Sequence, residues 1–278
     1  MSKQVVLITG ASSGFGELTA EKLLAMDRYI VYASARRVEK MESLKQQGAH
    51  ILKMDVTDND TVVAGVEQII REQGKIDVLL NNAGYGSYGL IETIPIEEVQ
   101  YQYDVNVFGM ARVLQAVLPH MRKQRSGRVV ITTSIVSHVS QMGLGWYAST
   151  KHALNAMCIA LRQEVRDLGI EVVMIEPGAV NTGFAEVAFG TMDAITPPED
   201  YRELHEGFRK FAVNNYAGAP GPESTANDMV KAITADKPQL VYKTTTDSKF
   251  MPSVVGMIPD RAFDSLILRT IRGALNQG

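Results

Sequence analysis

Tyr147 and Lys151 lie four residues apart in a segment, residues 146–168, whose pattern predicts a helix. Residues at this spacing share one helix face, so the phenol and the ammonium would point the same way. A free phenol titrates at about 10, and one close opposite charge lowers such a pKa by about 1–3 units. The pair could then donate and accept protons, although Tyr-x-x-x-Lys by itself is common in helices.

A serine hydroxyl precedes this pair at a position that could also face a ligand. Ser134 follows the strand predicted at residues 129–133 and lies 13 residues before Tyr147. The carboxyl ends of parallel strands open into the crevice where α/β proteins bind ligands. Ser134 could therefore hydrogen-bond a substrate carbonyl oxygen beside Tyr147.

A glycine-rich turn separates the first predicted strand, residues 5–9, from the first helix. It contains Gly10, Gly14 and Gly16. Side chains at such a turn would block a ligand, and a helix N-terminus offers free N–H groups to a pyrophosphate. The spacing differs from G-x-G-x-x-G, and the Lys of a P-loop is missing. Its position after the first strand of an alternating α/β chain nevertheless favours a phosphate-binding turn.

The end of the second predicted strand, residues 30–35, indicates which dinucleotide would bind. An acidic residue at this point would bind the ribose 2′-hydroxyl of NAD, whereas Arg accommodates the 2′-phosphate of NADP. The strand runs into Arg36 and Arg37, and Glu39 already belongs to the following helix. NADP(H) is therefore favoured over NAD(H), with Arg36 as the phosphate ligand and Arg37 and Ser12 as assistants.

The elements that must position these residues alternate along the chain. Short β-branched runs predict strands at residues 5–9, 30–35, 51–55, 78–81, 129–133, 172–176 and 240–242. Longer patterns predict helices at residues 16–26, 38–47, 59–72, 96–124 and 146–168, with Pro119 kinking or ending the fourth. The first six strands are nearly continuously apolar, as in sheets covered on both faces. The sequence predicts an α/β fold: a doubly wound, Rossmann-type, seven-stranded parallel sheet with helices on both faces.

We expect one Rossmann-type domain over residues 1–278, with two additions. Residues 183–222 are rich in Gly, Pro and aromatic residues and would cover a substrate site, the alternative being a packed surface excursion. Residues 250–278 would form a helical tail with an apolar stripe. Peripheral contact of this tail with a membrane was weighed, but packing against its own body or another subunit is favoured.

These ordered motifs resemble the short-chain dehydrogenase/reductase family over roughly residues 5–182. Within it, the chain looks most like the branch that includes 17-beta-hydroxysteroid and retinol dehydrogenases. The resemblance implies a catalytic set of Asn106, Ser134, Tyr147 and Lys151. It implies cofactor contacts from Gly10, Ser12, Ser13, Gly14, Phe15, Gly16, Arg36, Arg37, Asp55, Val56, Asn82, Ala83, Gly84, Tyr147, Lys151, Pro177, Gly178, Val180 and Thr182.

The resemblance also implies how these residues would act. Ser134 would hold the reacting oxygen, and Tyr147 would transfer its proton. Lys151 would depress the tyrosine pKa and anchor the nicotinamide ribose, while Asn106 would link Lys151 to solvent through water. The substrate would be a lipophilic carbonyl compound or alcohol in a pocket lined by Met142, Leu144, Phe184 and Phe189. Family members are commonly homodimers or homotetramers, which we expect here.

Two other classes of function are alternatives to an oxidoreductase. A catalytically silent NADP(H)-sensing protein could lose the Ser-Tyr-Lys set, which is intact here, and a methyltransferase-like site would want a carboxylate where Arg36 stands. Among the 278 residues the net charge is −3, which gives no reason to expect nucleic acid. The single Cys158 fits a reducing, cytoplasmic compartment, no group has metal-ligand spacing, and no apolar run approaches the roughly 20 residues of a membrane span.

Overall fold

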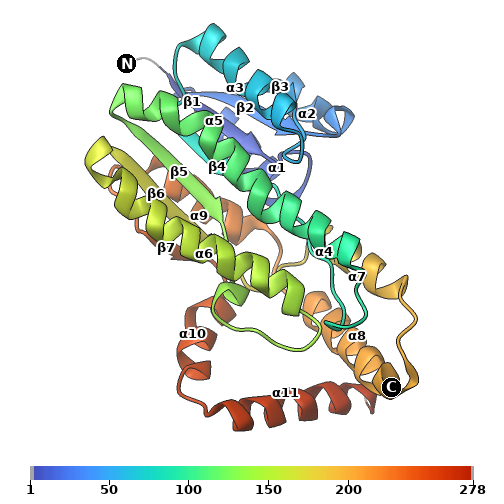
Figure 1. The fold of residues 1–278 in the computed structure, drawn as a ribbon. Coiled ribbons are helices and arrows are strands. Elements are labelled where there is room, and N and C mark those ends of the chain that lie inside the picture. Colours follow the sequence, from blue (N-terminus) through green and yellow to red (C-terminus); the bar gives the residue numbers. More distant parts are fainter. Residues whose placement is uncertain (1–2, 277–278) are drawn as a thin grey trace.

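A computed structural model describes residues 3–276 and contains a seven-stranded parallel sheet (Figure 1). The strand order is β3-β2-β1-β4-β5-β6-β7. The strands are β1 (Gln4–Thr9), β2 (Tyr29–Ala35), β3 (His50–Lys53), β4 (Val78–Asn81), β5 (Gly127–Thr132), β6 (Ile170–Glu176) and β7 (Val241–Lys243). The predicted doubly wound fold is confirmed. The order reverses between β1 and β4, so their carboxyl ends flank the ligand crevice of such folds.

Helices cover both faces of the sheet, as Figure 1 shows. The α-helices are α1 (Gly14–Leu24), α2 (Glu42–Gln46), α3 (Asn59–Gln73), α4 (Ile96–Tyr103), α5 (Gly109–Gln124), α6 (Gly145–Val165), α7 (Phe184–Asp193), α8 (Arg202–Ala217), α9 (Glu223–Thr234), α10 (Thr246–Val255) and α11 (Asp260–Leu275). Short 3-10 turns lie at Val38–Met41, Ile135–Ser137, Arg166–Leu168 and Glu199–Tyr201. Apolar side chains of α3, α5 and α6 pack on one sheet face, and those of α1, α2 and α9 on the other.

The helix expected over residues 96–124 is present and contains a π-helical turn. This turn, Asp104–Phe108, joins α4 to α5, and α5 continues past Pro119 to Gln124. Pro119 therefore does not end the helix early, and the alternative of a kink at this residue stays a prediction. Pro119 and Gln115 both lie on the exposed side of α5, where water can hydrogen-bond the carbonyl group that the proline leaves unpaired.

Residues 183–222 and the C-terminal tail are largely helical and pack together. Apolar side chains of α7, α8 and α11 form a third cluster, separate from the two clusters on the sheet. Ion pairs join α7 to α8 through Asp193 and Arg209 and α8 to α11 through Glu203 and Arg272. The tail thus packs against its own chain, and residues 277–278 of the predicted tail lie outside the described residues. No helix between residues 3 and 276 is both long enough and apolar enough to cross a bilayer.

Candidate active site

The glycine turn brings the carboxyl ends of β1 and β4 into direct contact. Gly10 has a φ of +68°, and a Cβ atom there would lie 2.9 Å from the Cα atom of Ala83. Asn82 and Ala83 donate their backbone N–H groups to Thr9 Oγ1, both at 3.0 Å. Gly16 is equally enclosed, because a Cβ atom there would lie 2.5 Å from the Gly10 carbonyl oxygen. A larger residue at either position would displace the backbone beside the crevice.

The N-terminus of α1 is open to a ligand. Ser13 occupies the N-cap position, but its side chain makes no capping hydrogen bond within residues 3–276. The first N–H groups of a helix have no intrahelical acceptor, and they carry the positive end of the helix dipole. This arrangement can hold a phosphate group. The cofactor contacts expected from Gly10, Ser12, Ser13, Gly14, Phe15 and Gly16 stay predictions.

Arg36 and Arg37 follow β2 at the same edge of the sheet, and both are exposed. The Arg36 guanidinium donates to the Tyr101 hydroxyl of α4 at 2.5 Å, across from the glycine turn. The Ala11 N–H group donates to the Ser34 carbonyl at 3.1 Å, which ties the turn to the end of β2. A cationic side chain therefore stands at the end of β2, and its predicted contact with a ribose phosphate stays a prediction.

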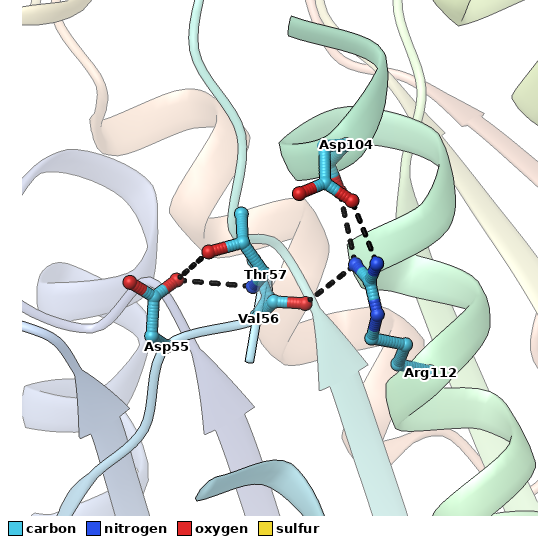
Figure 2. Close-up of polar contacts among 5 residues, drawn as sticks. All are labelled: Asp55, Val56, Thr57, Asp104 and Arg112. Carbon is cyan, nitrogen blue, oxygen red and sulfur yellow. Dashed lines mark hydrogen bonds and ion pairs between the residues drawn. The ribbon is translucent and has the colours of Figure 1, made fainter. Parts of the chain in front are cut away.

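The loop after β3 is fixed by two sets of hydrogen bonds, which Figure 2 shows. Asp55 accepts two hydrogen bonds from Thr57, one from its N–H group at 3.0 Å and one from its hydroxyl at 2.8 Å. Arg112 of α5 donates to the Val56 carbonyl at 3.1 Å and to the Asp104 carboxylate at 2.7 Å. The Asp55–Val56 pair is thus held against the start of α5, beside the π-helical turn.

Ser134, Tyr147 and Lys151 converge at the carboxyl end of β5. Lys151 Nζ donates to the Thr132 carbonyl at 3.0 Å and lies 5.8 Å from the centre of the Tyr147 ring. All three side chains are buried, with exposed fractions of 6% for Ser134, 8% for Tyr147 and 6% for Lys151. The structure therefore brings together the three groups that the sequence separates by up to 17 positions, and Tyr147 and Lys151 both point inward from α6.

The electrostatics of this group depend on its burial. Burial raises the pKa of Tyr147 far above its ordinary value, while the nearby Ser134 hydroxyl acts to lower it. Burial lowers the pKa of Lys151 to about 8, because an ammonium is poorly stabilised away from water. Burial therefore dominates the pKa values of both groups, and the lowering of the Tyr147 pKa expected from Lys151 stays a prediction.

Asn106 lies in the π-helical turn and connects two parts of the site. Its side-chain amide accepts from the Tyr85 N–H group and donates to the Tyr85 carbonyl, both at 2.9 Å, and its Nδ2 atom lies 3.3 Å from Thr150 Oγ1. Thr150 directly precedes Lys151 on α6. Asn106 thus holds the loop after Gly84 against α6, and a π-helical turn at such a place is typical of functional sites.

The loop after β6 is held by residues that the sequence analysis missed. Thr245 Oγ1 accepts from the Gly178 N–H group at 2.8 Å, and the Asp247 carboxylate accepts from the Ala179 N–H group at 3.2 Å. A Cβ atom on Gly178 would lie 2.0 Å from an Asp247 carboxylate oxygen. Thr245 begins α10 with a capping box. The sequence shows that capping pattern, but nothing local indicates which distant loop it contacts.

The residues predicted to line a substrate pocket lie together around Tyr147. Met142, Leu144, Phe184 and Phe189 all pack in the third apolar cluster, and the ring centres of Phe184 and Tyr147 are 5.5 Å apart. Sequence reasoning missed Tyr88, whose ring packs edge-on against that of Tyr147 at 5.8 Å. A depression of about 320 Å³ adjoins the cluster. It is lined by Leu90, Ile91, Ser140, Gln141, Met142, Gly143, Gly145 and Asp264.

Two further side chains lie near the site. His138, directly after the 3-10 turn Ile135–Ser137, lies 2.8 Å from the buried carboxylate of Glu176. Cys158 is buried, and burial raises the pKa of its thiol to about 12, which makes it unreactive. Across residues 3–276, no group of three or more His, Cys, Asp or Glu side chains could hold a metal ion.

Several characterised or catalogued proteins are similar to this chain. A 3-ketodihydrosphingosine reductase of Bacteroides thetaiotaomicron is 41% identical over 67% of this chain and 67% of its own length. An NADPH-dependent 3-dehydrocapnine reductase of Ornithobacterium rhinotracheale is 33% identical over 96% of both chains. Human 17-beta-hydroxysteroid dehydrogenase type 1 is 33% identical over 91% of this chain and 80% of its own length.

Solved structures and a family model agree with these relatives. A short-chain dehydrogenase from Streptomyces avermitilis superposes with a TM-score of 0.80 at 29% identity, over all of this chain and 96% of its own. Other structural neighbours contain NADP or 5-hydroxy-NADP, and two contain NAD or NADH. The family model described as short chain dehydrogenase matches residues 4–192. With the sheet order, the glycine turn and the Ser-Tyr-Lys group already established, the chain belongs to the short-chain dehydrogenase family of oxidoreductases.

Proposed function

We propose that this protein transfers hydride between NADP(H) and a carbonyl compound or alcohol, with Tyr147 as the proton donor and acceptor. The observation that carries the proposal is the convergence of Ser134, Tyr147 and Lys151 at the carboxyl end of β5, above the glycine turn. The bound nicotinamide supplies or takes the hydride, and the protein supplies geometry and electrostatics.

In the direction of reduction, two hydroxyl groups act on the carbonyl oxygen. Ser134 donates a hydrogen bond to it, and Tyr147 gives it a proton as the carbon becomes an alcohol carbon. Burial raises the pKa of Tyr147, so its phenol remains protonated at neutral pH and is ready to donate. Lys151 would hold the nicotinamide ribose, and Asn106 keeps the loop after Gly84 in place beside it.

The residues present fit a dinucleotide phosphate. The positive φ of Gly10 and the close packing of Gly16 keep the backbone open to a pyrophosphate, and the α1 N-terminus offers its N–H groups. Arg36 favours the 2′-phosphate of NADP(H), and the NADPH dependence of the 3-dehydrocapnine reductase supports that preference. A neighbour that contains NAD shows that the fold by itself accepts either dinucleotide.

The chemical class of the substrate is proposed from the surroundings of Tyr147. The rings of Phe184 and Phe189 and the side chains of Met142 and Leu144 would contact a lipophilic substrate. The similarity to a human 17-beta-hydroxysteroid dehydrogenase supports a bulky apolar ketone or alcohol. Assembly into a homodimer or homotetramer stays a prediction.

Turnover with and without the Tyr147 hydroxyl tests the proposal. The wild type and Tyr147→Phe are both assayed with NADPH and a panel of chemically diverse ketones. The binding of NADPH to Tyr147→Phe is measured separately by fluorescence. We expect Tyr147→Phe to bind NADPH normally and to lose at least about 100-fold in kcat, because general acid catalysis contributes about that much. Full activity of the variant would contradict the assigned proton donor. Binding of NADPH by the wild type without turnover of any ketone would favour the cofactor-sensing alternative.

A further inference from the structure

A buried phenol and a partly buried phenol stand beside Tyr147 and take no part in the proposed proton transfer. Tyr88 lies in the loop after β4, and Tyr216 lies near the end of α8. Their hydroxyl oxygens are 2.6 Å apart, so one donates to the other. The two rings are stacked, with centres 6.5 Å apart, and the Tyr88 ring also packs edge-on against Tyr147.

Aromatic rings surround this hydroxyl pair, and the Tyr147 phenol and the Asp247 carboxylate also lie near enough to act on it. Phe189 packs edge-on against both Tyr88 and Tyr216, at 6.0 and 5.9 Å, and Phe208 lies 6.3 Å from Tyr88. Tyr88 is 2% exposed. Burying a hydroxyl among apolar groups costs free energy unless it is hydrogen-bonded, and replacing both partners of a buried bond by apolar groups can be nearly neutral. Phenylalanine at both positions would therefore give an equally good core.

The pair has hydrogen-bonding capacity left over. Two phenols carry two O–H donors, and their mutual bond uses one. In the part of the chain that the structure describes, neither hydroxyl bonds any other protein atom. One O–H donor and the oxygen lone pairs thus remain free beside the ring of Tyr147. Burial raises the pKa of both groups, so the pair stays uncharged at neutral pH.

We propose that the Tyr88–Tyr216 pair recognises a hydroxyl group of the substrate close to the reacting carbonyl. This inference rests on the proposed function, because it places that carbonyl at Tyr147. The substrate would then be a lipophilic hydroxyketone, or the corresponding diol in the reverse direction. A substrate hydroxyl can accept the free O–H and donate to a free lone pair, which satisfies every group. A ketone without that hydroxyl would leave the buried donor unpaired.

A matched pair of ketones tests this specificity. The probes are 1-hydroxydodecan-2-one and dodecan-2-one, which share the chain length and the position of the carbonyl. We expect the wild type to favour the hydroxyketone by about 10-fold or more in kcat/KM, because an unpaired buried hydroxyl costs about 1–3 kcal/mol. Tyr88→Phe and Tyr216→Phe should each reduce that preference to about 3-fold or less while keeping the ring and its packing. Equal use of both ketones by the wild type, or a preference that survives both substitutions, would overturn the inference.

A control and a binding measurement separate this inference from the proposed function. Tyr29 has a buried hydroxyl without a partner among residues 3–276 and lies in the apolar cluster formed with α1, α2 and α9, not in the third cluster, so Tyr29→Phe should leave the preference unchanged. Calorimetry with the NADPH-loaded Tyr147→Phe variant then measures the affinity for each ketone without turnover. Preferential binding without wild-type turnover would overturn the proposed reaction and support the pair. Turnover without preferential binding would support the proposed reaction and overturn the role of the Tyr88–Tyr216 pair. Binding of neither ketone would overturn both proposals.

Discussion

Lys151 places an ammonium group in a site that is almost closed to water. Its side chain is 6% exposed, and its contacts are the Thr132 carbonyl and the ring of Tyr147. Burial lowers its pKa from the ordinary 10.5 to about 8. Between these two values the unfolded chain binds more protons than the folded protein, so stability rises with pH in that range. Below about pH 8 the lysine is charged in both states, and its full desolvation cost remains.

This difference predicts a pH dependence of stability. Relative to Lys151→Met, the free energy of unfolding of the wild type should increase by about 2–3 kcal/mol between pH 7 and pH 10. The variant lacks the titrating ammonium group. It also leaves the Thr132 carbonyl without its hydrogen bond, and the free-energy cost of that loss is the same at every pH. Urea unfolding of both proteins at several pH values gives the comparison. Parallel curves would mean that Lys151 keeps its ordinary pKa in the folded protein.

Arg36 is the side chain on which the cofactor preference depends. Arg36→Asp replaces the phosphate ligand by a carboxylate that repels a 2′-phosphate and can bind a 2′-hydroxyl. We expect the Kd for NADPH to rise by about 10-fold or more, with NADH bound equally well or better. Lys40→Asp makes the same change of charge in the following 3-10 turn and should have a much smaller effect. Fluorescence titration with NADPH and NADH measures the Kd values of the two variants. Similar losses of NADPH affinity in both would argue against a specific contact between Arg36 and the 2′-phosphate.

The crossing of α8 and α11 depends on a glycine. A Cβ atom on Gly207 would lie 2.7 Å from the Ile271 carbonyl oxygen, whereas a Cβ atom on Gly273, also helical, would meet nothing within 4 Å. The same substitution should therefore have opposite effects at the two positions. Gly207→Ala should lower the free energy of unfolding by about 1–3 kcal/mol through overpacking, and Gly273→Ala should raise it by about 0.5–1 kcal/mol. Thermal melts of the two variants test this, and a stabilised Gly207→Ala would show that the helices separate at no cost.

Elements with strong local patterns could be predicted, and those set by distant contacts could not. The six apolar strands and the helices between them follow from runs and periods in the sequence, and the structure contains them. The π-helical turn has no such local signature. It coincides with the bonds of Asn106 to Tyr85 and with the close packing of Gly109, whose Cβ atom would lie 2.7 Å from Val56. Whether Pro119 ends the helix could not be predicted from the sequence, because the effect of a proline depends on which side of α5 faces water.

For the molecule as a whole, parallel topology explains why much of the site could be located from sequence. Every strand of a parallel sheet ends at the same edge, so Gly10 after β1, Asn82 after β4 and Ser134 after β5 must meet there. Residues that reach this edge from elsewhere carry no such marker. They are Tyr88 from a loop, Tyr216 from the end of α8, and Thr245 and Asp247 from the start of α10, and only the fold brings them to the site. The depressed pKa of Lys151 also needed coordinates, because it depends on burial.

The contact of Thr245 and Asp247 with Gly178 and Ala179 sets a boundary for protein engineering. Swapping C-terminal tails between relatives is an obvious way to exchange substrate preference, since α11 packs on the helix that carries Tyr216. A junction placed directly after β7 would also remove the two acceptors that hold the loop following β6. Chimaeras joined beyond Ser248 retain those acceptors, so any altered selectivity in them can be attributed to the exchanged helices.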